Sequence, residues 1–184
     1  TADRYLNEGK VVIFAAGNDA VTMALPAAYE KVISVAAIGP YGSLAYYSNY
    51  GDWVTVCAPG GDQTFPDGGV YSTMPDGSYG GYQGTSMACP HVSGIAALLL
   101  SAAGGPDYTN RDLWDAVVRA TDESIYEFNP GYIGKLGKGM VDAELALSTL
   151  NREAPQPVTD FGLSTLSNSI ECELAVPSDD GGTA

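Results

Sequence analysis

The chain has 184 residues, with 22 acidic side chains against 8 basic ones and a formal net charge of −14 at pH 7. This charge excludes nucleic acid as a partner, because phosphate binding needs a basic face that so few lysines and arginines cannot form. Apolar residues make up 45% and charged residues 16%, which is typical of a packed globular domain. No apolar run approaches the ~20 residues of a membrane span, so we expect no membrane-spanning segment.

Unbroken apolar and β-branched runs in the first half of the chain predict buried strands. They cover residues 10–16, 32–38 and 53–58, and a shorter run at 70–73 indicates a fourth strand. Glycine and proline are frequent across residues 59–84, which we expect to be mostly loop. Strands that are apolar on both faces are typical of a parallel sheet covered by helices.

Three helices are expected after these strands. The longest apolar stretch, residues 85–103, is apolar around its whole circumference and predicts a helix in the middle of a core. A second helix fits residues 110–120, where Thr109 and Asp112 stand near the spacing of a capping box. A third fits residues 141–150. Strands and helices together predict an α/β fold built around a parallel sheet.

The composition changes after residue 152, which divides the chain into regions 1–152 and 153–184. Residues 154–157 read as an extended linker, and residues 158–163 and 169–176 have the character of short strands. Two strands cannot bury a core alone. The segment resembles the opening strands of a fibronectin type III or immunoglobulin-like module, so we expect the start of a β-sandwich there.

The residues that point to chemistry begin with the string GTSMACPHVSG at positions 84–94. A serine in the first turn of a buried helix, Ser86, lies beside unpaired backbone N–H groups where a developing anion would sit. Pro90 has no N–H, so the carbonyl of Ser86 loses its helical partner, and Gly84 permits close approach by a bound chain. An isolated Thr-Ser at a helix start would instead be an ordinary N-cap.

The whole string resembles the serine signature of the subtilisin-like serine peptidases. The upstream segment VVIFAAGND resembles the part of that family in which an asparagine follows Ala-Ala-Gly at the end of a strand. The resemblance gives Ser86 the role of nucleophile. It gives Asn18 the role of a donor to the developing oxyanion, together with the backbone N–H of Ser86. The alternative for Gly17 and Asn18 is a simple turn after a strand.

The resemblance covers residues 9–150 and implies part of a three-layer, parallel-sheet subtilisin-like fold. Further segments that carry it are 25–29, 32–38, 47–51, 57–60 and 137–141. It also implies that the end of the first strand lines the pocket for the residue before the cleaved bond. The substrate-binding residues predicted in this way are Ala15, Ala16, Gly17, Gly84 and Thr85.

The family chemistry requires no cofactor. The loop at residues 27–32 corresponds to a weak cation site in the family, which gives a structural calcium hypothesis for the backbone carbonyls of Ala27, Tyr29 and Val32. The alternative is a solvated loop. Three widely spaced cysteines indicate neither a disulfide scaffold nor a zinc cluster, and we expect Cys57 and Cys89 to be buried thiols.

A base for the serine is missing from these 184 residues. In subtilisins the triad follows the order Asp, His, Ser, but the single histidine here, His91, follows Ser86 on the same helix and faces another way. We therefore expect His91 to be structural, and Asp19, Asp52 and Asp62 to be loop carboxylates. Two explanations remain: an inactive relative, or the carboxyl part of a peptidase that partners an upstream part of the same domain. The second is favoured, and this chain alone should be inactive.

The function predicted is that of a serine endopeptidase that cleaves polypeptides through an acyl-enzyme, in an extracellular or cell-surface protein. One alternative is a non-catalytic peptide-binding or adhesion protein on a degenerate peptidase fold. Another is a lipase or esterase of the α/β-hydrolase type. That class expects GxSxG, whereas Ala88 stands two residues after Ser86.

Overall fold

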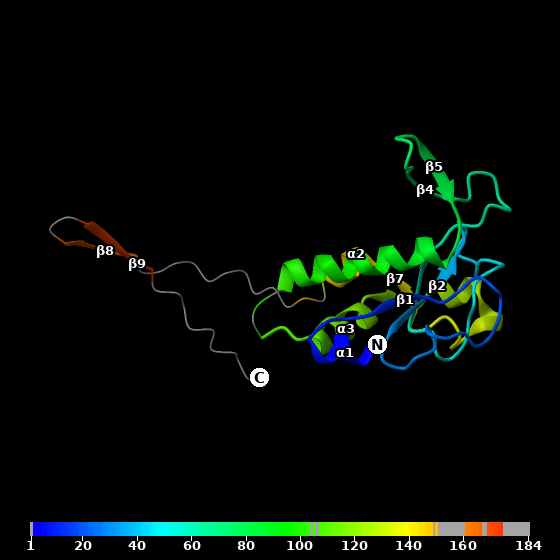
Figure 1. The fold of residues 1–184 in the computed structure, drawn as a ribbon, viewed down its shortest axis with the longest axis horizontal. Helices are drawn as coiled ribbons and strands as arrows, with labels where there is room; N and C mark the ends of the chain where they lie inside the picture. Colours follow the sequence, from blue (N-terminus) through cyan, green and yellow to red (C-terminus); the bar gives the residue numbers. More distant parts are fainter. Residues whose placement is uncertain are drawn as a thin grey trace. The chain divides into compact units, whose positions relative to one another are not determined.

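The computed structural model describes residues 2–103, 105, 107–148 and 150, together with the backbone of residues 161–166 and 169–174. The chain divides into two compact units, residues 1–150 and 151–184. The first unit is built on a five-stranded sheet in the order β1-β2-β3-β7-β6 (Figure 1). Its strands are β1 (Ile13–Ala15), β2 (Ile33–Ile38), β3 (Val56–Pro59), β7 (Met140–Val141) and β6 (Thr121–Asp122). The first four run parallel and β6 is antiparallel to β7, which confirms the α/β class with a mostly parallel sheet.

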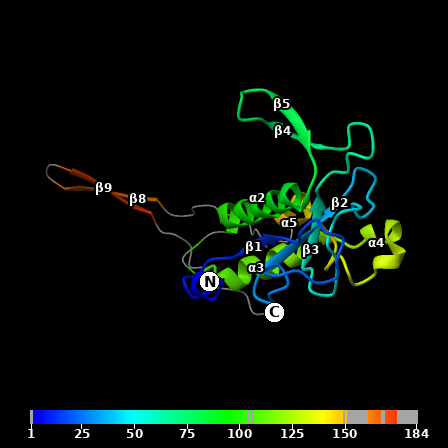
Figure 2. The same cartoon turned by 45° about the vertical axis from the view of Figure 1, so that its right-hand side comes forward.

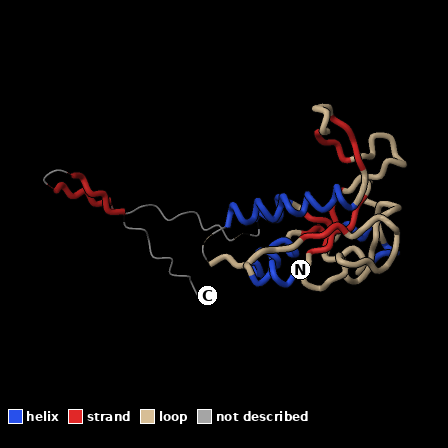
Figure 3. The backbone as a smooth tube through the Cα atoms, viewed as in Figure 1, coloured by secondary structure: helices blue, strands red, loops and turns tan. Residues whose placement is uncertain are grey.

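Helices pack on the two faces of the sheet, and the tube in Figure 3 draws these helices in blue and the strands in red. On one face α2 (Thr85–Ala103), α3 (Asn110–Arg119) and α5 (Ala143–Ser148) share a core with the sheet. The other face packs against the short α4 (Ile125–Phe128) and the 3₁₀ helix η1 (Pro130–Tyr132), with the loops around them. The first helix, α1 (Ala2–Asn7), lies beside the start of α3, where the side-chain amide of Asn110 donates to the carbonyl of Leu6 at 3.0 Å.

Strand β2 is buried along its whole length, as its unbroken apolar run predicts. Because successive side chains point to opposite faces, Ile33 and Val35 enter the core under α2 while Ala36 and Ile38 enter the opposite one. The one polar side chain in the strand, Ser34, is also fully buried and donates to the carbonyl of Trp53 at 2.8 Å. The strand therefore carries no unpaired hydroxyl into the core.

Two apolar segments are less buried than their sequence suggests. Strand β1 is three residues long and only half-buried, because it lies at the edge of the described sheet. Helix α2 has the predicted bounds but buries one face only. On that face Val92 and Leu99 are fully buried, whereas Leu98 and Leu100 on the outer face are 48% and 49% exposed. The prediction of a helix buried on all sides is therefore wrong for the outer face of α2.

Helix α2 bears on the expectation that the chain has no membrane-spanning segment. Within the described part of the chain, its 19 residues are long and apolar enough to cross a membrane by length and composition alone. A core helix passes the same test, and the inner face of α2 is packed against the sheet. This finding is therefore only weak evidence for a membrane segment.

A β-hairpin interrupts the region that we expected to be mostly loop. Strand β4 (Val70–Thr73), which was predicted, pairs antiparallel with β5 (Tyr79–Tyr82), which was not. Two adjacent glycines inside β5 hid its strand character from pattern reading. Figures 1 and 2 show the hairpin standing away from the sheet and from the body of α2.

The predicted cap of α3 and the burial of Cys57 are confirmed, whereas Cys89 is less buried than expected. Helix α3 is capped by Thr109, which forms the predicted capping box with Asp112. Cys57 is buried, as expected, and burial raises the pKa of its thiol to about 12, whereas Cys89 is only partly buried. In the second unit β8 (Phe161–Leu166) and β9 (Ser169–Leu174) form an antiparallel pair. The expected linker at 154–157 and the rest of the proposed β-sandwich module lie outside the described residues.

Candidate active site

Ser86 is the second residue of α2 and is exposed at the first turn of that helix. The preceding Gly84 has a φ of +147°, a conformation that only glycine adopts readily, and its carbonyl accepts from the N–H groups of Met87 and Ala88 at 2.9 and 3.3 Å. The N–H of Thr85 donates to the side chain of Asn18. None of these bonds uses the N–H of Ser86, which therefore remains available to a ligand, because the first N–H groups of a helix have no partner within the helix.

Asn18 comes directly after the Ala-Ala-Gly that ends β1, and Thr85 orients its side chain. The Oδ1 atom of Asn18 accepts from both the backbone N–H and the hydroxyl of Thr85, at 2.9 and 2.8 Å. The Thr85 hydroxyl in turn accepts from the N–H of Gly17 at 3.1 Å. With Oδ1 held by two donors, the Nδ2 of Asn18 is the end of the amide that remains available as a donor.

Asn18 and Ser86 lie next to a shared space beside Gly84. A methyl group built on Gly84 would lie 3.6 Å from Asn18 Nδ2 and 3.7 Å from the backbone nitrogen of Ser86. Two N–H donors that border one small space, next to a serine hydroxyl, form the arrangement that stabilises the oxyanion of an acyl-transfer reaction. The structure thus brings together the two residues that the sequence predicted as catalytic.

The residues predicted to bind substrate fall into two groups. Ala15 ends β1 half-buried, Ala16 is buried, and Gly17 has a φ of +103°. Gly84 and Thr85 are buried beside Ser86, and the Thr85 side chain is fully used in bonds to Gly17 and Asn18. The substrate contacts of all five residues stay predictions.

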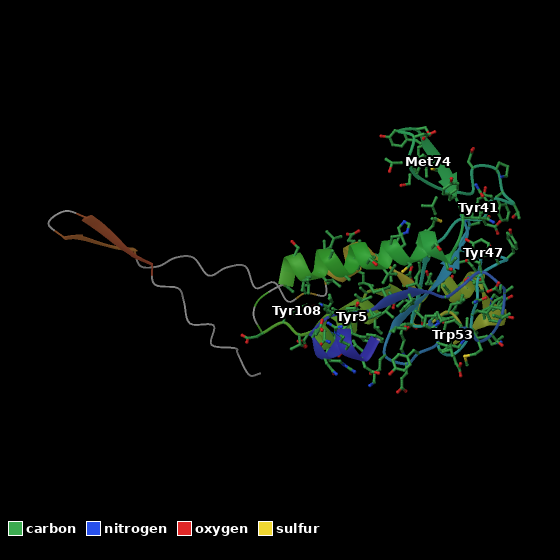
Figure 4. All side chains as sticks on the ribbon, in the orientation of Figure 1. Tyr5, Tyr41, Tyr47, Trp53, Met74 and Tyr108 are labelled. Carbon is green, nitrogen blue, oxygen red and sulfur yellow. The ribbon has the colours of Figure 1, made fainter. Side chains whose placement is uncertain are left out.

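A groove of about 410 Å³ opens between the β4–β5 hairpin and the first turns of α2. It reaches Met87, the residue after Ser86, and Met74 at the far end of the hairpin (Figure 4). Three tyrosines of the hairpin, Tyr71, Tyr79 and Tyr82, are 73%, 64% and 59% exposed. Two of these tyrosines, Tyr71 and Tyr82, line the groove and are open to solvent.

His91 and the loop carboxylates do not form a pair with Ser86. The ring Nδ1 of His91 lies 2.8 Å from the carbonyl of Met87, so the ring bonds to its own helix. Asp62 lies in a loop, as expected, but it is buried and accepts from the N–H and hydroxyl of Thr64 at 3.0 and 2.6 Å. Asp19 and Asp52 are exposed.

The calcium hypothesis concerns the loop that follows the cis peptide bond between Leu25 and Pro26. Here the carbonyl of Tyr29 accepts from the N–H of Val32 at 3.1 Å. Asp3 reaches this loop, but the Tyr29 hydroxyl and the Lys31 ammonium engage one carboxylate oxygen each. The Lys31 bond, then the Tyr29 bond, lower the pKa of Asp3. Within the described residues no three His, Cys, Asp or Glu side chains group as a metal site, and the carbonyl site at Ala27, Tyr29 and Val32 stays a prediction.

The chain is an α/β protein in which a serine at the start of a core helix lies near an asparagine amide from the end of a parallel strand. The chain belongs to the subtilase family: residues 2–151 match the model of that peptidase family, S8. This membership removes the α/β-hydrolase alternative.

Relatives and solved structures agree with the family. The chain is 38% identical over 170 residues to an extracellular basic protease of Dichelobacter nodosus, which covers 84% of this chain and 26% of that protein. It is 37% identical over 149 residues to subtilisin E of Bacillus subtilis, covering 78% of this chain and 35% of the relative. A solved protease of Pseudoalteromonas arctica superposes with a TM-score of 0.68 at 38% identity, over 80% of this chain and 44% of its own. The chain thus spans about a quarter to a third of the length of these curated relatives.

Proposed function

We propose that this chain carries the nucleophile and the oxyanion hole of a serine endopeptidase. The observation that supports the proposal is the space beside Gly84, bordered by Asn18 Nδ2 and the N–H of Ser86. In the proposed reaction the Ser86 hydroxyl attacks a peptide carbonyl of the substrate. The carbonyl oxygen becomes an anion, which Asn18 Nδ2 and the N–H of Ser86 stabilise. The C–N bond then breaks, and the base delivers the proton taken from Ser86 to the leaving amine. The acyl-enzyme left on Ser86 is hydrolysed by water, which releases the acid and restores the hydroxyl.

The proton of Ser86 has to be taken by a base from outside these 184 residues. His91, the single histidine of the sequence, bonds to its own helix. In subtilisins the aspartate and the histidine precede the serine. Since the match to subtilisin E covers 35% of that protein, the relatives have ample chain to carry both groups. We infer that an upstream part of the same domain supplies the histidine and the aspartate, and that the 184 residues alone are inactive.

The substrate in this proposal is an extended polypeptide. The residues of the substrate before the cleaved bond would lie along the end of β1, at Ala15, Ala16 and Gly17. The residues after the cleaved bond would lie in the groove under the β4–β5 hairpin, and Met87 lines this groove. The names of relatives such as the extracellular basic protease support an extracellular location. The acidic composition of the chain is compatible with it.

The experiment compares this chain with a chimera in which residues 2–151 replace the matching part of subtilisin E. Both are treated with a fluorophosphonate probe, and the labelled residue is identified by mass spectrometry. We expect labelling at Ser86 and hydrolysis of peptides by the chimera, with the isolated chain essentially unlabelled. Ser86→Ala in the chimera should lower kcat by about 10⁶-fold, the loss measured on subtilisin itself.

Two outcomes would contradict the proposal. A folded chimera that leaves Ser86 unlabelled would remove its role as nucleophile. Strong labelling of the isolated chain at Ser86 would show that the base lies within these residues.

A further inference from the structure

Asn49 is a fully buried amide that contacts the loop carrying Asn18. Its Oδ1 accepts from the N–H groups of Asp19 and Val21, both at 3.0 Å, and its Nδ2 donates to the carbonyl of Ala16 at 2.9 Å. Its own backbone N–H donates to the carbonyl of Gly17 at 2.9 Å. All of these partners are within three positions of Asn18 in the sequence.

The bonds of Asn49 hold the backbone on both sides of Asn18. The carbonyls of Ala16 and Gly17 are fixed before it, and the N–H of Asp19 is fixed after it. Gly17 makes this close approach possible, because a Cβ at that position would collide with Nδ2 of Asn49. The φ of +103° at Gly17 also disfavours any other residue.

The bond pattern calls for an asparagine. One oxygen has to accept two N–H groups while a donor on the same planar group meets a carbonyl, and only a carboxamide supplies both. An aspartate of the same shape would keep the acceptors but turn a second oxygen toward the Ala16 carbonyl. An alanine would leave the N–H groups of Asp19 and Val21 and the carbonyl of Ala16 without these partners.

We propose that Asn49 is a positioning residue of the oxyanion hole, which acts through Asn18 and touches no substrate. The proposal rests on the proposed function and deepens it. Thr85 holds the side-chain oxygen of Asn18, and Asn49 holds the backbone on which that side chain is mounted. A displacement of about 1 Å of a group that stabilises a transition state can lower the rate by about 100-fold.

Sequence reasoning gave Asn49 no role. The residue lies in segment 47–51, whose only signal was its resemblance to the family. Its partners are 28 to 33 positions away, so no local pattern reveals them.

Asn129 offers a matched control. It is also a buried amide with three side-chain hydrogen bonds: Oδ1 accepts from the N–H of Leu44, and Nδ2 donates to the carbonyls of Gly42 and Ile125. It lies next to α4, in a different part of the fold from Asn18. Asn49→Ala and Asn129→Ala therefore remove equal numbers of bonds from equally buried sites, and only the first should affect the oxyanion hole.

The first test uses the 184-residue chain itself, labelled with ¹⁵N-asparagine. We expect Asn49→Ala to shift or broaden the side-chain amide signals of Asn18 and to speed their exchange with solvent. Asn129→Ala should leave these signals unchanged while lowering the melting temperature by a similar amount. This test needs no activity, so it is independent of the proposed function. Unchanged Asn18 signals in folded Asn49→Ala would overturn the proposal.

The second test measures kinetics in the chimera with subtilisin E. We expect Asn49→Ala to lower kcat by about 10- to 100-fold with KM changed less than about twofold, and Asn129→Ala to leave kcat within about twofold. In a background that already carries Asn18→Ala, Asn49→Ala should lower kcat by no more than about twofold, because both act through one amide. If Asn49→Ala lowered kcat by the same factor with and without the side chain of Asn18, Asn49 would have a general structural role and the proposal would be rejected.

Should Asn49→Ala fail to fold, Asn49→Asp provides the same comparison, because it keeps both acceptor contacts and replaces the donor to Ala16 by a second oxygen. We expect it to lower kcat at least tenfold in the same Asn18-dependent manner. An inactive wild-type chimera would count against the proposed function, whereas the NMR result would still decide the role of Asn49.

Discussion

Two segments flank Ser86, and they are built in opposite ways. On one side, the junction of Gly17, Asn18 and Thr85 is held by short hydrogen bonds, with the Thr85 side chain 1% exposed. On the other side, the β4–β5 hairpin is held by the antiparallel pairing of its own two strands, and its tyrosines are largely exposed. The difference indicates a division of tasks. The junction fixes the atoms that would meet a transition state, where small displacements are costly, and the hairpin offers a surface that different chains could contact.

Among changes in the two segments that flank Ser86, the largest effect is expected at the junction, from Asn18→Ala. The change removes the side-chain donor that borders the space beside Gly84. We expect kcat of the chimera to fall by about 100- to 1,000-fold with little change in KM, a range measured on subtilisin for the loss of this type of donor. Steady-state kinetics on a peptide anilide would measure it. A loss expressed mainly in KM would mean that Asn18 binds the substrate and not the transition state.

A smaller effect is expected from Thr85→Val, which keeps the shape of the side chain and removes its hydroxyl. Asn18 loses one donor to Oδ1, and the N–H of Gly17 loses its acceptor. Since one such bond contributes about 0.5–1.5 kcal/mol, we expect kcat of the chimera to fall by about tenfold and the free energy of unfolding to fall by about 1–3 kcal/mol.

Thr85→Ser is the control for that change, because it retains the hydroxyl and should stay within about threefold of the wild-type kcat. If serine reduced kcat as much as valine does, the methyl group of Thr85 would matter as much as its hydroxyl. The junction would then depend on packing, which would break the contrast with the hairpin.

The same contrast explains how much of the molecule could be predicted from the sequence. Strand β2 and helices α2 and α3 follow from local patterns, namely apolar runs and a capping box. The pairing of Asn18 with Ser86 follows only from the resemblance of two distant segments to the family. The exposed outer face of α2 could not be predicted, because periodicity reports how apolar a helix is but not what covers it. Strand β5 was hidden by its glycines. The role of Asn49 depends on which loops the sheet brings together, and no local pattern reports that.

The smallest effect is expected at the hairpin. Tyr71 and Tyr79 stack on each other with ring centroids 6.0 Å apart, and both are mostly exposed. Exposed positions of this kind rarely change stability by more than about 0.5 kcal/mol. We therefore expect Tyr71→Ala, at the member of this pair that lines the groove, to leave kcat of the chimera for a short ester substrate unchanged. For peptides that extend past the cleaved bond into the groove, it should raise KM by about two- to threefold.

Tyr5→Ala on α1, another exposed tyrosine, should change neither value and is the matched control. A series of peptides with increasing numbers of residues after the cleaved bond would show where KM begins to rise, because only peptides long enough to reach the groove lined by Tyr71 should be affected. A tenfold fall in kcat for the short ester would mean that the hairpin helps to position Ser86. In that case the two segments would share one task, and the hairpin would belong to the catalytic machinery.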